Sequence, residues 1–314
     1  MKLFITGISG LLGLNLALQT KDDFTVSGAF HSQPVSLPGC ETVPLDVTSP
    51  QEVDGALGSL RPDLIIHTVA MTDVDRCESN PTLAQELNQV AARNVARSAA
   101  AIGARLVHIS TDHLFSGTNP WTTESESPTP VNVYARTKFE GETSVREACP
   151  DALIVRTNFF GWGTSVRTSF SDWVLGRLRD GQDLNMFSDA YFTPVLINDM
   201  VDLILKLVDH EATGVINIGG ADRISKYGFA LELAREFGYS ADRITPVSMD
   251  TIDLNAVRPK DMSFSSQKIE SLLDTKMPAL ADSLARLKSL SVSGWPGALE
   301  SAIAGPAALS NMAN

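Results

Sequence analysis

A glycine-rich turn near the start of the chain constrains the fold more than any other sequence feature. It follows an apolar run at residues 3–5, which predicts a buried strand. The turn itself spans Thr6–Gly13, and leucines then repeat at i, i+3 and i+7 from Leu11, the spacing of a helix face. A strand that passes through a glycine turn into a helix is typical of the first unit of a dinucleotide-binding α/β fold.

The same alternation continues along the first half of the chain. A helix is expected over 49–60, with Ser49 as N-cap, Pro50 at its first position and Glu52 closing a capping box. A long helix is expected to start at Asn80. Further strands are predicted at residues 24–30, 64–67, 106–110 and 153–156. Strands and helices that alternate in this way predict an α/β fold, a Rossmann-type doubly wound parallel sheet with helices on both faces.

The length of 314 residues is enough for about two domains. We expect residues 1–155 to form mainly an NAD(P)-binding Rossmann domain. Residues 156–288 are expected to form mainly a smaller C-terminal substrate-binding α/β domain, with some segments that return to the sheet. A helix at 199–208, a strand at 215–218 and a helix at 225–237 fall in this part. From about residue 289 the composition shifts to Ser, Gly, Ala and Pro, which predicts a flexible tail over 289–314.

Charge and cysteine content exclude several classes of function. The formal net charge is −12, which disfavours partners with phosphate backbones and anionic lipid surfaces. We therefore expect no nucleic acid and no membrane as partner. Three scattered cysteines are typical of free thiols in a reducing compartment. No signal peptide and no apolar run long enough for a membrane span is found, so a cytoplasmic protein is expected.

The spacing of the turn is Gly-x-x-Gly-x-x-Gly. Gly7 allows the tight turn, Gly10 lets the backbone approach a diphosphate, and Gly13 lets the helix pack closely on the sheet. The helix N-terminus then offers free N–H groups to the phosphates. The predicted diphosphate-binding residues are Gly7, Ser9, Gly10, Leu11, Leu12 and Gly13.

The residues after the second strand bear on the choice of dinucleotide. A carboxylate at this place would bind the ribose hydroxyls of NAD and repel the extra phosphate of NADP. The chain has His31 and Ser32 here, both able to hydrogen-bond a phosphate, and neither a carboxylate nor an arginine. The sequence therefore favours NADPH, with NADH as the alternative.

A second group of residues carries acid–base chemistry. Tyr134 and Lys138 stand four positions apart on a predicted helix, so both can contact one ligand. A neighbouring ammonium is expected to lower the pKa of the tyrosine, and Lys138 can also hydrogen-bond a ribose. Thr111 follows a predicted strand and could donate to a carbonyl oxygen. Ser110 beside it is an alternative.

In this order the glycine triplet, the Ser/Thr and Tyr-x-x-x-Lys resemble the extended short-chain dehydrogenase/reductase superfamily. More narrowly, the chain resembles the dTDP-4-dehydrorhamnose reductase family. The segments that carry this resemblance are Ser110–Gly117, Ser127–Tyr134, Thr72–Asp75 and Arg258-Pro259. It extends from Met1 to about Leu287.

The resemblance implies reduction of the 4-keto group of a dTDP-linked 6-deoxyhexose by NADPH or NADH. The catalytic residues it implies are Thr111, Tyr134 and Lys138. Tyr134 and Lys138 would also contact the cofactor. Further cofactor contacts are implied for Asp46 and Val47 near the adenine, and for Ala70 and Met71 in the cleft. Thr111 and Asp112 would contact the sugar. The oligomeric state is left open, with a homodimer as one expectation.

Departures from the family pattern lie on the substrate side. Phe159 replaces a tryptophan near the sugar, which keeps an apolar wall and loses the indole N–H donor. Residues 189–194 match only loosely. No metal site is expected: the carboxylates Asp73, Asp75 and Glu78 are interpreted as a solvated turn and helix face.

Three functions remain open. The first is reduction of a keto sugar, with Tyr134 as proton donor. The second is a catalytically silent cofactor-binding regulatory subunit, since a fold does not fix a function. The third is a nucleotide-sugar epimerase, or a reductase of another keto substrate, built on the same site. A dehydratase is disfavoured because Asp112 is followed by His113 where the second carboxylate would stand.

Overall fold

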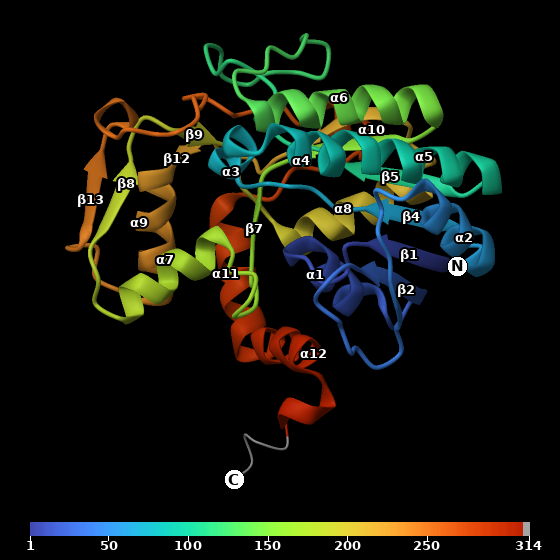
Figure 1. The fold of residues 1–314 in the computed structure, drawn as a ribbon. Helices are drawn as coiled ribbons and strands as arrows, with labels where there is room; N and C mark the ends of the chain where they lie inside the picture. Colours follow the sequence, from blue (N-terminus) through green and yellow to red (C-terminus); the bar gives the residue numbers. More distant parts are fainter. Residues whose placement is uncertain (310–314) are drawn as a thin grey trace.

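The computed structural model describes residues 1–309 and is built around a seven-stranded parallel sheet (Figure 1). Its strand order is β11-β6-β5-β4-β1-β2-β3. The order reverses direction at β1, which is the arrangement of a doubly wound sheet. The predicted α/β fold is confirmed. The strands are β1 (Lys2–Thr6), β2 (Thr25–Phe30), β3 (Glu41–Pro44), β4 (Leu64–His67), β5 (Arg105–Ile109), β6 (Leu153–Thr157) and β11 (Gly214–Ile218).

Helices cover both faces of this sheet because successive side chains of a strand point to opposite faces. On β1, Leu3 and Ile5 pack against α1 (Leu11–Thr20) and α8 (Ile197–Asp209). Phe4 lies on the other face, in a core shared with α2 (Pro50–Leu60), α5 (Ala91–Ile102) and α6 (Val133–Ala148). Both faces of β1 are therefore buried, as its uninterrupted apolar run indicated.

The capping residues begin the helices close to where the sequence predicts, with one difference. Ser49 accepts a hydrogen bond from the Glu52 N–H at 3.4 Å, and Pro50 is the first residue of α2. The predicted capping box is wrong in its second half. The Glu52 carboxylate accepts from the Asp46 N–H at 3.1 Å, so it ties the helix to the loop after β3.

The long helix expected from Asn80 is interrupted in its middle. It consists of α4 (Pro81–Gln85), the π-helical turn η1 (Glu86–Val90) and α5. It is preceded by α3 (Val74–Ser79). A π-helical turn inside an α-helix frequently marks a functional site, and Asn88 lies in this one.

A second lobe packs beside the carboxyl ends of the sheet strands, at the left of Figure 1. Its core joins α7 (Phe170–Arg179), α9 (Lys226–Phe237) and α11 (Leu280–Val292). Three two-stranded pairs complete it: β7 (Phe159–Phe160) with β10 (Val195–Leu196), β9 (Tyr191–Phe192) with β12 (Ile224–Ser225), and β8 (Leu184–Phe187) with β13 (Ile244–Val247). The short helix η2 (Met249–Thr251) follows, and α10 (Gln267–Leu273) returns to the main sheet, where Ile269 is part of the core.

The prediction of a loosely attached segment after residue 289 is wrong for the described residues. α11 continues to Val292, and α12 spans Trp295–Leu309. Leu299 is fully buried in the core beside α1, and the Trp295 indole donates to the Asn15 side chain at 2.8 Å. Residues 310–314, also in the predicted tail, lie outside the described part of the chain.

None of the helices described in residues 1–309 has the length and apolar character that crossing a membrane requires.

Candidate active site

The glycine turn after β1 makes the close approaches that glycine alone permits. Gly7 has φ +70°, the left-handed region that other residues rarely adopt. A Cβ atom on Gly13 would stand 2.2 Å from the Gly7 carbonyl oxygen. α1 begins after Gly10 with no side-chain cap and no acidic residue in its first turn, so its first N–H groups and positive dipole end can meet an anion. This turn fits a dinucleotide diphosphate.

Substitution of Gly13 tests this fit. Gly13→Ala is expected to push α1 away from the turn, since the Gly7 carbonyl cannot move without disturbing β1. Overpacking of this kind costs about 1–3 kcal/mol. We expect dinucleotide affinity, measured by titration of nicotinamide fluorescence, to fall about tenfold or more. Gly58→Ala in α2 is the control, because a Cβ there meets nothing within 4 Å and affinity should stay at the wild-type value.

The other predicted cofactor residues follow the carboxyl ends of their strands. His31 and Ser32 are exposed directly after β2. Asp46, after β3, accepts from the Thr48 N–H and hydroxyl at 2.9 and 2.7 Å, and these bonds lower its pKa. Val47 beside it is buried. All these loops open at one edge of the sheet, the edge at which ligands bind in such folds.

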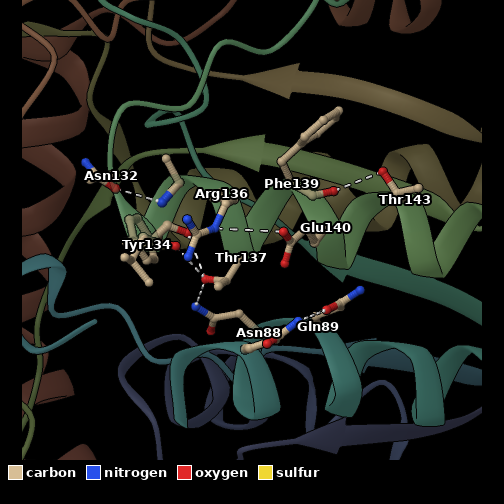
Figure 2. A network of polar contacts seen from close by, with 12 residues as sticks. Asn88, Gln89, Asn132, Tyr134, Arg136, Thr137, Phe139, Glu140 and Thr143 are labelled. Atoms are coloured by element: carbon tan, nitrogen blue, oxygen red, sulfur yellow. Dashed lines mark hydrogen bonds and ion pairs between the residues drawn. The ribbon is translucent and has the colours of Figure 1, made fainter. Parts of the chain in front are cut away.

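Ala70 and Met71 lie in the loop after β4, at the same edge as the glycine turn. Met71 is buried in a small apolar cluster with Val133 and Tyr134. Figure 2 shows Asn88 pointing from η1 toward Thr137 on α6, to which it donates at 3.0 Å. The Asn88 side chain also accepts from the Met71 N–H at 2.8 Å and donates to the Met71 carbonyl at 3.2 Å. Asn88, which sequence reasoning missed, thus fixes the cleft loop against the helix that carries Tyr134.

The structure brings the three predicted catalytic residues together. Tyr134 and Lys138 lie on one face of α6, whose N-cap Asn132 accepts from the Ala135 N–H at 2.8 Å (Figure 2). Thr111 follows β5, and its side chain is near enough to act on the ionisation of Tyr134. Tyr134, Lys138 and Thr111 are 7%, 2% and 4% exposed. A ligand here would be largely removed from water.

The electrostatics differ from the sequence expectation. Burial raises the pKa of Tyr134 well above its ordinary value, and the nearby Thr111 hydroxyl opposes this only in part. The expected lowering by the Lys138 ammonium is not found. Lys138 Nζ instead donates to the Ile109 carbonyl at 2.7 Å, and burial lowers its pKa to about 8, against the opposing charge of Glu142. Tyr134 is therefore a protonated phenol, suited to donate rather than to accept a proton.

Two histidines lie buried near Lys138. His67 and His108, on neighbouring strands, stack with their ring centroids 5.4 Å apart. Burial lowers the pKa of both, to about 3 for His67, and the charge of Lys138 adds to the effect. Both rings are therefore neutral, and they add no positive charge near Lys138.

Ser110, the alternative to Thr111, has a different role. Its hydroxyl donates to the Glu142 carboxylate at 2.6 Å. Arg156 donates to the same carboxylate through two nitrogens, at 2.9 and 2.7 Å. Glu142 is fully buried one helical turn beyond Lys138. The Ser110 hydroxyl is thus engaged in a buried cluster with Glu142 and Arg156. Thr111 is therefore the hydroxyl beside Tyr134.

The predicted sugar contacts are Thr111, described above, together with Asp112 and Phe159. Asp112 accepts from the Asn158 amide and, at 3.3 Å, from the Thr111 hydroxyl. His113 packs edge-on against the Tyr134 ring, with centroids 5.5 Å apart. Asp112 is thus at the site. Phe159 packs half-buried on the core near the sheet, so its contact with a sugar stays a prediction.

One cation at the site was missed by sequence reasoning. Lys226, the first residue of α9, has its Nζ 3.4 Å from the centroid of the Phe192 ring. Burial lowers its pKa to about 8, and the charge of Asp112 opposes this shift. Its sequence context is an ordinary helix start, with no signal that its charge acts near Asp112.

The interpretation of Asp73, Asp75 and Glu78 as a solvated turn and helix face is confirmed, since Asp73 and Glu78 are exposed and Asp75 is half-buried, and each carboxylate also has a hydrogen-bond partner. Asp73 caps α3 by accepting from the Arg76 N–H at 3.0 Å, and Glu78 accepts from the Val133 N–H at 3.1 Å. Asp75 accepts from the Ala256 N–H and from Arg258, at 3.1 and 2.6 Å. These carboxylates tie the start of α6 and the 255–258 loop together. The residues described contain no group of three or more His, Cys, Asp or Glu side chains that could hold a metal ion.

The parallel sheet, the glycine turn and the buried Thr-Tyr-Lys set together define an oxidoreductase of the extended short-chain dehydrogenase/reductase superfamily. Residues 1–290 match the family model described as the RmlD substrate binding domain. The chain belongs to this family, and α12 lies beyond the matched residues.

Three similar proteins represent the range of relatives. The probable low-salt glycan biosynthesis reductase Agl14 of Haloferax volcanii is 31% identical over 294 residues, 92% of this chain and 98% of the relative. The methionine adenosyltransferase 2 subunit beta of Mus musculus is 30% identical over 280 residues, 86% of this chain and 82% of the relative. The structure of dTDP-4-dehydrorhamnose reductase from Bacillus anthracis in complex with NADP has a TM-score of 0.83 at 26% identity, covering 92% of this chain and 98% of that one.

Proposed function

We propose that this protein reduces the 4-keto group of a nucleotide-linked deoxysugar, with NADPH or NADH as reductant. The observation that carries the proposal is the burial of Tyr134, Lys138 and Thr111 together, next to a glycine turn shaped for a diphosphate. The bound dinucleotide supplies a hydride for the carbonyl carbon. Membership of a family that includes dTDP-4-dehydrorhamnose reductases supports the substrate class.

Each member of the trio has a separate task in this proposal. Tyr134 donates its phenolic proton to the keto oxygen as the alkoxide forms, and its raised pKa keeps that proton in place beforehand. Thr111 donates a hydrogen bond to the same oxygen and polarises the carbonyl. Lys138 would hold the ribose hydroxyls of the dinucleotide.

The two parts of the chain divide the binding. Residues 1–155 mainly bind the dinucleotide, and residues 156–288 mainly bind the sugar. Asp112 bridges the two parts, because it accepts from Asn158 just after β6. We assign the sugar hydroxyls to Asp112 and an apolar wall of the sugar pocket to Phe159.

NADPH is the proposed preference, since the exposed residues after β2 include no carboxylate to repel a 2′-phosphate. Ser32→Asp would place a carboxylate there. We expect this variant to shift the ratio of kcat/KM values toward NADH by about tenfold or more. Ser36→Asp, on the same loop but farther from β2, is the control and should leave the ratio unchanged. An unchanged ratio in Ser32→Asp would mean that the ribose lies elsewhere.

The direct test is the loss of reduced-nicotinamide absorbance when the purified protein is mixed with dTDP-4-dehydro-L-rhamnose and NADPH, then NADH. We expect rapid oxidation that depends on the sugar. Absence of oxidation with both dinucleotides, each at a concentration that saturates the protein, would contradict the proposal.

A second function is favoured by one comparison. The mouse relative named methionine adenosyltransferase 2 subunit beta is a subunit of an enzyme with a different chemistry. If this chain is likewise a regulatory subunit, it will bind a dinucleotide, as measured by fluorescence, and oxidise none with any keto sugar. The intact Thr-Tyr-Lys set leads us to place the reductase first.

A further inference from the structure

Lys226 stands in the sugar half of the site with its ammonium group held by aromatic rings. Its Nζ lies 3.4 Å from the centroid of Phe192 and 4.7 Å from that of Phe170. The Phe192 side chain is buried, and the backbone N–H of Lys226 donates to the Ala190 carbonyl at 2.9 Å. The position of the cation is thus fixed by β9 and by the first turn of α9.

This arrangement leaves the donors of the ammonium group unused. A cation over the face of a ring is attracted by the quadrupole of the ring and needs no hydrogen bond to it. Within residues 1–309 no carboxylate lies at ion-pair distance from Lys226 Nζ, and Asp112 acts on it only through its longer-range charge. Lys260, in contrast, pairs with Asp250 at 2.5 Å. Lys226 therefore keeps three N–H donors for a ligand.

Lys226 places a cation near Tyr134 in an otherwise acidic protein. Lys226 and Arg258 both act electrostatically on His113, which packs on the Tyr134 ring, and Asp112 acts on it in the opposite sense. Arg258 is paired with Asp75, which leaves Lys226 as the cation without a carboxylate partner among the described residues. The chain as a whole carries a net charge of −12, so an anionic substrate would be repelled from most of its surface. Local cations at the site offset this repulsion and direct an anion to it.

The position in the fold separates this cation from the dinucleotide. α9, β9 and β12 belong to the second lobe at the left of Figure 1, whereas α1, which follows the glycine turn, lies to the right of this lobe. The anion that meets Lys226 therefore belongs to the sugar substrate and not to the cofactor.

We propose that Lys226 is a specificity-determining residue that binds anionic oxygens carried by the sugar substrate, a phosphate on its anomeric carbon or a carboxylate. The inference rests on the proposed function, because it assumes a keto sugar beside Tyr134. The aromatic rings hold the ammonium group in place, and its unused N–H donors and positive charge would hold a negative group there.

Binding without turnover provides the test. Calorimetric titration of dTDP, glucose 1-phosphate and glucuronate compares wild type with Lys226→Met, Lys226→Arg and the control Lys276→Met, an exposed lysine of the same chain. We expect Lys226→Met to weaken binding of at least one anion by about tenfold. Lys226→Arg and Lys276→Met should stay near wild type, and NADPH affinity should be unchanged in all variants. The anion affected distinguishes phosphate from carboxylate.

Kinetics give the second readout. With a saturating dinucleotide, Lys226→Met should raise KM for the sugar about tenfold and change kcat much less. Equal anion affinities in wild type and Lys226→Met, or no binding of any probe to wild type, would overturn the inference and leave the reduction itself intact. Lys226-dependent binding of dTDP without dinucleotide oxidation would support the inference and contradict the proposed reaction.

Discussion

Tyr134→Phe is expected to reduce kcat by about 10²–10⁴-fold while leaving dinucleotide affinity near the wild-type value. The substitution removes one hydroxyl and keeps the ring, which packs with Met71 and Val133 and meets the edge of His113. Because the packing is preserved, the loss isolates the proton that Tyr134 supplies to the keto oxygen. The measurement pairs stopped-flow loss of nicotinamide absorbance with fluorescence titration of the dinucleotide.

Tyr239→Phe is the matched control, since Tyr239 is half-buried and packs against the core of the second lobe, away from α6. Turnover of the Tyr239→Phe variant should remain within twofold of wild type. If Tyr134→Phe retained wild-type turnover, another group would have to donate the proton, and the assignment of Tyr134 would be lost. A parallel loss of dinucleotide binding would instead indicate a damaged α6.

The cofactor half of the molecule could be predicted from sequence because local rules decide it. The turn at Gly7 needs a positive φ, and Gly13 needs the absence of a Cβ. Tyr134 and Lys138 share a face on any helix. These requirements involve only a few neighbouring residues, so the sequence motif predicts the local geometry directly.

The rest depends on contacts between segments distant in sequence. The charge of Asp112 acts on Lys226 only because the second lobe, which contains α9, folds back toward the loop after β5. α12 is ordered because Leu299 fits the core beside α1, which composition cannot show. The raised pKa of Tyr134 follows from its depth of burial. Sequence pattern and composition carry no information on these three features.

The second large effect concerns the buried group behind Lys138. Glu142→Ala is expected to lower the free energy of unfolding by about 3–5 kcal/mol. The Glu142 carboxylate accepts from Arg156 through two nitrogens and from the Ser110 hydroxyl, all in a region closed to water. Its removal leaves the Arg156 cation buried and without its partner. Urea denaturation followed by circular dichroism gives the value.

Glu140→Ala is the control on the same helix, because Glu140 is partly exposed and lies 3.9 Å from Arg136 (Figure 2). A surface pair of this kind is worth less than about 1 kcal/mol. The double variant Glu142→Leu/Arg156→Met should recover most of the stability, since both charges are then absent. A loss in Glu142→Ala no larger than in Glu140→Ala would mean that the buried pair contributes nothing. A loss confined to catalysis would make Glu142 a positioning residue for Lys138 alone.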